Sequence, residues 1–189
     1  MASKVQICNL ALSRLGAAII TSLTDGTTEA NLCSTFFDDL AERAMIQGSW
    51  TTTIKRAELA KTTNTPSYEF SSEFQLPVDP KCLKLLEINE SLAGSTPHAV
   101  EGDKLLTNTS TVKIKYIAEL TDTEDYGPML TEALEILLAS YLAHPITGSA
   151  SLARELKGEY FELVARNLAI DGQQGTKQKI QAEDLIEVR

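Results

Sequence analysis

The side chains best suited to chemistry are few in this sequence and lie far apart. There are two histidines, His98 and His144, and three cysteines, Cys8, Cys33 and Cys82. No His-x-x-x-His or Glu-x-x-His spacing occurs, so the paired ligands that zinc sites use are missing. His144 falls at the expected end of a helix, where a cation is favourable, and a capping role is the simplest interpretation. The sequence therefore predicts no metal ligands and no cofactor.

The cysteines form no Cys-x-x-Cys pair, and their number is odd. The first residues, MASKVQICNL, lack the basic-then-apolar layout of a secretion signal, so we expect reduced thiols. Each cysteine has apolar neighbours in the sequence, and a free cysteine packs as a small hydrophobic side chain. We therefore expect all three to be packing residues rather than nucleophiles.

Three carboxylates, Asp38, Asp39 and Glu42, are close enough in sequence for acid–base chemistry. The alternative is the solvated face of an amphipathic helix, which we favour because acids are routine on such faces. The sequence has no G-x-S-x-G, Walker or G-x-G-x-x-G motif. No catalytic residue is predicted, and an enzyme has no positive support.

Four helices are predicted. The first, 3–15, begins with the S-x-x-Q spacing of a capping box and is followed by a glycine. The second, 28–47, takes its first residue, a threonine, as N-cap. The third, 128–144, follows a Gly-Pro pair and ends before a proline, and the fourth, 149–169, is stopped by Gly172.

The intervening segment, 51–120, has the period of strands. Residues 68–76 alternate apolar and polar side chains, as a half-buried strand does, and residues 83–88 predict a strand buried on both faces. Pro77 and Pro80 separate the two, and we expect two antiparallel strands whose pairing with each other these prolines limit. Turns are also predicted at 101–103 and 108–110, with a last strand at 112–117.

The predicted fold class is therefore α+β. It consists of a bundle of about four helices (1–50 and 121–172), an inserted antiparallel β-meander (51–120) and an extended C-terminal arm (173–189). The arm is polar at first and ends in a few apolar residues, too few to fold alone. We expect it to become ordered on a partner.

The net charge of −9 comes from acids spread along the whole chain. A phosphate-binding surface needs clustered Lys and Arg, so binding to nucleic acid is disfavoured. An acidic wall can still surround DNA, because it repels phosphate. No apolar run approaches the roughly 20 residues that cross a bilayer, so we expect no membrane contact and synthesis in the cytoplasm.

Taken in order, these segments resemble the head-to-tail connector (adaptor) proteins of tailed bacteriophages, the tail tubular protein A-like family. The resemblance begins with VQICNLALSRLGAAIITSLTDGTTEANLC, a helix ending in Leu-Gly, a polar turn and a second helix. It continues through Trp50, the Leu76-Pro77 strand end, the helix EALEILLASYLAHPIT and the final IEVR. The hydroxyl-rich Thr51–Thr53 departs from the aromatic pattern expected there. The likeness covers nearly the whole chain and depends on order and spacing.

The resemblance implies a structural virion protein of the head–tail junction and not an enzyme. Such adaptors form a ring, commonly of twelve copies, beneath the portal protein, extend the DNA channel and offer a platform to the next tail or nozzle protein. DNA would pass through without specific binding. The C-terminal arm would dock on the portal or a neighbouring copy, with apolar anchors and basic side chains paired to acids. The residues expected at this interface are Lys177, Lys179, Ile180, Leu185, Ile186, Val188 and Arg189.

Three alternatives stay open at this point. One is a phage tail-completion protein that acts at a different joint. Another is a small cytoplasmic enzyme, which a pocket with converging polar groups around a histidine would favour. The third is a nucleic-acid-binding module, which would show salt-dependent binding to DNA.

Overall fold

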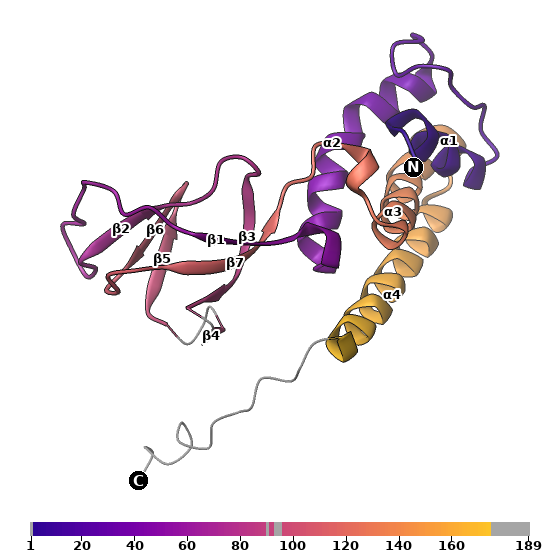
Figure 1. Cartoon of the computed structure of the whole chain (residues 1–189). Coiled ribbons are helices and arrows are strands. Elements are labelled where there is room, and N and C mark those ends of the chain that lie inside the picture. The colour runs from indigo at the N-terminus through magenta and orange to yellow at the C-terminus, as the bar shows by residue number, and fades with distance from the viewer. Residues whose placement is uncertain (1, 90, 93–95, 175–189) are drawn as a thin grey trace.

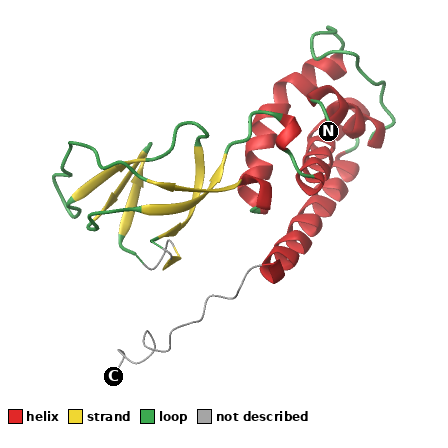
Figure 2. Cartoon of the chain, viewed as in Figure 1, coloured by secondary structure: helices red, strands yellow, loops and turns green. Residues whose placement is uncertain are grey.

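The computed structural model describes residues 2–89, 91, 92 and 96–174. Helices gather at one end of the molecule and strands at the other (Figures 1 and 2). This arrangement confirms the α+β class predicted from the sequence. None of the helices in the described residues is long and apolar enough to cross a membrane.

α1 (Lys4–Arg14) begins and ends where the sequence predicts. The Oγ of Ser3 accepts a hydrogen bond from the N–H of Gln6 at 3.2 Å, which satisfies one of the free donors at the helix start. Beyond the last turn, Gly16 has a φ of 65°, which glycine adopts without strain. The residues of α1 that face the helical core are Ile7, Cys8, Ala11 and Leu12.

α2 (Thr28–Gly48) begins at Thr28, as the sequence predicts. Its N-cap is Thr27, however, so the prediction of Thr28 as the N-cap is wrong. The Thr27 hydroxyl accepts a hydrogen bond from the N–H of Ala30 at 3.2 Å, so Thr28 is already the first helical residue. Two adjacent threonines offer the same capping group, and the sequence alone does not distinguish them.

α3 (Pro128–Thr147) is the central helix of the bundle and is buried around its circumference. The prediction that it ends near His144 is wrong, because it continues through Pro145. A proline so near the end removes only the bond to the Tyr141 carbonyl, which the packing of the helix tolerates. The helix stops at Gly148, which has a φ of 73° and donates its N–H to the His144 carbonyl at 2.9 Å.

α4 (Ala150–Gln174) also extends beyond its predicted end near residue 169. Gly172, expected to stop it, lies inside the helix. A glycine in a helix costs about 1 kcal/mol relative to alanine but keeps its backbone hydrogen bond, so it does not end the helix by itself. At the start, the Oγ of Ser149 accepts a hydrogen bond from the N–H of Leu152 at 3.2 Å.

The inserted strands form two small antiparallel sheets, whose order differs from that of a simple meander. The four-stranded sheet has the order β1 (Ile54–Glu58), β7 (Lys113–Ala118), β3 (Cys82–Ile88) and β4 (Ser91–Leu92). The three-stranded sheet has the order β2 (Ser72–Gln75), β6 (Lys104–Thr107) and β5 (His98–Glu101). Short 3-10 turns, η1 (Thr51–Thr53) and η3 (Thr123–Asp125), lie where the chain passes between strands and helices.

The two strands expected to pair with each other lie in different sheets. β2 pairs with β6, whereas β3 pairs with β7. Pro77 and Pro80, which cannot donate to a ladder, separate them. The N–H of Cys82 donates to the Pro77 carbonyl at 3.0 Å, and the chain turns there into the other sheet. The predicted pairing is therefore wrong.

The strand predicted for residues 68–76 is also shorter than expected. Tyr68 is 82% exposed, and Glu69 has a φ of 64°, which is incompatible with a strand. The turn predicted at 101–103 is confirmed, because Gly102 lies between β5 and β6 with a φ of 60°. The predicted turn at 108–110 is instead a connection between the two sheets.

Two hydrophobic cores result, and β3 and β7 contribute to both. One core lies within the helices, and the other is shared by the two sheets. In β7, Ile117 packs into the helical core and Tyr116 into the sheet core. In β3, Leu83 packs against the helical core and Leu85 against the sheet core. The prediction that residues 83–88 use both faces is confirmed. The helices thus cover only one end of the outer face of the four-stranded sheet.

Candidate assembly surfaces

The residues predicted to form the arm interface lie outside the described residues. They are Lys177, Lys179, Ile180, Leu185, Ile186, Val188 and Arg189. Their role stays a prediction. The helix that precedes them, α4, carries two exposed apolar side chains seven residues apart on one face, Phe161 and Leu168, which are 51% and 45% exposed. Exposed Ala165 lies between them and completes a narrow apolar stripe.

The cysteines are placed for packing, as predicted. Cys8 and Cys33 are buried in the helical core, and Cys82 is half-buried against the sheet core. A hydrogen bond with Cys33, together with burial, raises the pKa of the Cys8 thiol, and burial raises the pKa of Cys82 to about 11. A protonated thiol is a poor nucleophile and a poor metal ligand. Among the described residues, no group of three His, Cys, Asp or Glu side chains comes close enough to hold a metal ion.

The two histidines lie in different parts of the fold. His98 is in β5, and its Nδ1 lies 2.7 Å from the Thr96 carbonyl oxygen. His144 is in the last turn of α3. The Thr96 carbonyl fixes the orientation of the His98 ring, and the side chain of His144 is exposed.

Charged side chains cover the part of the four-stranded sheet that the helices leave open. Beyond Ile117, which packs into the helical core, the next outward pair is Arg56 opposite Lys115. The register adds residues from β3 on the same face. We call this group the sheet patch, and it consists of Arg56, Glu58, Lys84, Glu87, Lys113 and Lys115.

Positive charge dominates the sheet patch. The Nζ of Lys115 donates to Glu87 at 2.9 Å, and this ion pair neutralises both groups. Arg56, Lys84 and Lys113 have no carboxylate within 4 Å in the part of the chain that the structure describes. A pocket of about 330 Å³ lies beside Arg56 and Lys113. Its lining residues are Arg56, Ala57, Glu58, Glu87, Lys113, Ile114 and Lys115. An acidic side chain entering it would meet three cations, Arg56, Lys113 and Lys115, together with Glu58 and Glu87.

A surface of the opposite sign lies where α2 meets the connection from β7 to α3. We call it the junction patch, and it consists of Asp38, Glu42, Glu119 and Asp122 with Lys4 and Lys81. Lys4 bonds to Asp38 at 2.6 Å, and Lys81 lies 3.9 Å from Glu42. Within the described ranges, Glu119 and Asp122 lie within 4 Å of no basic side chain. The patch is therefore net negative.

Three carboxylates of the junction patch lie close enough to Tyr126 to affect its hydroxyl. Burial, followed by the charges of Asp38, Glu119 and Asp122, raises the pKa of Tyr126 to about 12. The hydroxyl donates to the Leu120 carbonyl at 3.2 Å. Tyr126 also lines a pocket of about 280 Å³ together with Asp38, Glu42 and Glu119. Three carboxylates from two segments thus share one electrostatic environment.

Neither patch is predicted from the sequence. One signal was present for the junction patch, because no Lys or Arg occurs between Lys115 and Arg154, a stretch that contains six acids. The sheet patch has no comparable signal. Its residues come from three strands that are far apart in the sequence, and only their register brings them together.

No family model matches the sequence, and no curated protein is significantly similar to it.

Proposed function

We propose that this protein is a head-to-tail adaptor of a tailed bacteriophage, a structural component that forms a ring under the portal protein and extends the DNA channel. The observation that carries the proposal is the order of the elements. Two helices, a β-rich insertion and two further helices follow one another, in agreement with the fold that the resemblance implies. The three cysteines pack against the two cores and the His98 ring contacts the backbone, which suits a structural role.

A ring subunit has several neighbours, and the described surfaces offer several separate contacts. They are the sheet patch, the junction patch and the apolar stripe of α4. The proposed partners are the portal protein through the C-terminal arm, neighbouring copies of the chain, and the next tail protein. DNA would pass without binding, because the segment 121–172 has nine acidic and three basic side chains and repels phosphate.

The first test is the mass of the protein alone and of its mixture with the portal ring encoded in the same genome. Light scattering after size exclusion gives both values. We expect a complex much larger than the portal ring itself. If the portal ring is intact and no complex forms, the result contradicts the adaptor function and favours a tail-completion protein at another joint.

The second test removes the arm. Because α4 continues to Gln174, the truncation belongs after that residue rather than after Gly172, where it would shorten the helix. We expect the truncated chain to fold and to lose binding to the portal ring. Within the full chain, Ile186→Asp should weaken binding, whereas Gln181→Asp, which adds the same charge at a polar position, should not. Equal effects of both substitutions would contradict apolar anchoring.

A further inference from the structure

We infer that the sheet patch of one copy binds the junction patch of the next copy. The two patches carry opposite net charge on the same chain. Three cations of the sheet patch and two carboxylates of the junction patch lack ion-pair partners within the described residues. This inference rests on the proposed ring and names the contact that would build it.

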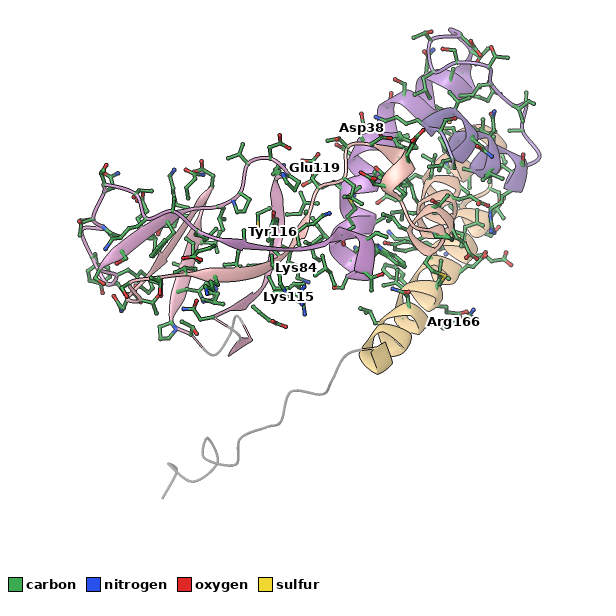
Figure 3. The ribbon with its side chains drawn as sticks, viewed as in Figure 1. Asp38, Lys84, Lys115, Tyr116, Glu119 and Arg166 are labelled. Carbon is green, nitrogen blue, oxygen red and sulfur yellow. The ribbon has the colours of Figure 1, made fainter. Side chains whose placement is uncertain are left out.

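The positions of the patches fit a repeating contact. Figure 3 shows Asp38 and Glu119 on the upper side of the junction between strands and helices, and Lys84 and Lys115 on its lower side. A surface that binds a different surface of an identical copy leaves both partners with one unused patch. Copies can therefore be added in one direction, and a ring forms where the rotation closes.

A second copy fits the sheet patch better than nucleic acid does. Glu58 and Glu87 lie among its cations and would repel phosphates. The junction patch carries both signs, so it can place carboxylates beside Arg56 and Lys84 and a lysine (Lys4 or Lys81) beside Glu58, whereas a nucleic-acid backbone offers phosphates alone. The pockets of about 330 Å³ and 280 Å³ leave room for side chains of the neighbouring copy.

Reversing each patch separately tests the contact. The sheet-reversed variant is Arg56→Glu with Lys113→Glu, and the junction-reversed variant is Glu42→Lys with Glu119→Lys. Each variant alone then presents two patches of the same sign. In an equimolar mixture, the acidic sheet patch of one variant meets the basic junction patch of the other, and the remaining two patches are also complementary.

The measurement is self-association by sedimentation velocity over a concentration series, at about 50 mM salt, where charges are screened less than at physiological ionic strength. We expect the unmodified chain to associate and each variant alone to associate about tenfold more weakly, since like charges face each other. The mixture should associate as the unmodified chain does, within about threefold. Raising the salt concentration should weaken the association of the unmodified chain and that of the mixture.

Three outcomes would overturn the inference: an unmodified chain that stays monomeric, variants that associate normally alone, or a mixture that does not recover. The matched controls reverse charges on α4 (Figure 3 labels Arg166) and should leave association unchanged. They are Arg154→Glu with Arg166→Glu, and Glu155→Lys with Glu162→Lys. The portal ring is absent from this experiment, so its failure is distinguishable from failure of the adaptor function.

Discussion

At the scale of single residues, the close contact between Gly48 and Trp50 fixes how the chain leaves the helices. Ser49 has a left-handed φ of 46°, and this turns the chain so that Trp50 folds back on α2. The indole Nε1 donates to the Ala44 carbonyl at 2.8 Å, and Trp50 is only 3% exposed. A Cβ on Gly48 would overlap the indole ring, so glycine is needed there for space rather than for its backbone freedom.

The first prediction compares two glycines in helices. Gly48→Ala should lower the free energy of unfolding by about 1–3 kcal/mol, because the indole must shift in a packed core. Gly158→Ala, in α4 with open space around its position, should raise it by about 0.5–1 kcal/mol. Urea unfolding followed by the fluorescence of Trp50, the one tryptophan, measures both. Equal effects of the two substitutions would contradict the packing at Gly48.

At the scale of elements, different interactions join the parts of the fold. Within the bundle, Arg14 at the end of α1 bonds Glu135 of α3 at 2.5 Å and Glu159 of α4 at 3.0 Å. Between bundle and sheets, the link is mainly apolar and uses Ile117 of β7 with Leu83 and Leu86 of β3. Ile117 is fully buried in the helical core, although it belongs to a strand.

The second prediction concerns this link. Ile117→Ala should lower the free energy of unfolding by about 2–5 kcal/mol, since it leaves a cavity where the sheet meets the helices. Val100→Ala, in β5 and 49% exposed, removes a similar β-branched side chain and should change it by less than about 0.5 kcal/mol. Denaturation curves of both variants check this. A cost at Ile117 as small as at Val100 would mean that the sheets do not depend on this contact.

At the scale of the whole molecule, charge is unevenly distributed. Residues 51–120 have nine acidic and eight basic side chains and are almost neutral. Residues 121–172 have nine acidic side chains and only three basic ones. The acidic character of the chain therefore belongs mainly to the helices, and the strand-rich segment 51–120 holds eight of the 17 basic side chains. We therefore expect the helical end to repel nucleic acid and the strand end to offer cations to an acidic protein surface.

The third prediction is that the chain does not bind duplex DNA. Fluorescence anisotropy of a labelled duplex should stay constant up to about 100 µM protein at low salt, the condition that favours binding through phosphates. The sheet-reversed variant should give the same result, because the sheet patch is not a phosphate site. Binding that weakens as salt is raised, and that this variant abolishes, would instead identify the sheet patch as a nucleic-acid surface.

Four features follow from the sequence alone: the α+β class, the cap of α1 by Ser3, the turn before β6 and the two-faced character of residues 83–88. These features depend on hydrogen bonds and side-chain periods within a few residues, which a sequence displays directly. Three predictions based on such local patterns were wrong: they concerned the N-cap of α2, where Thr27 is used, the end of α3 before Pro145 and the end of α4 at Gly172. The ends of α2, α3 and α4 depend on which of two similar caps is used and on packing that outweighs a local breaker.

Two features depend on contacts that form only in the folded chain: β2 and β3 belong to different sheets, and charges from distant segments form two patches of opposite sign. Strand pairing and its register are contacts between residues far apart in the chain, and each strand has several possible partners of similar pattern. The sheet patch forms only when these strands have paired in their register. Arg56 and Lys115 become neighbours, and Asp38 and Glu119 share one pocket, because the fold closes the long loops between them.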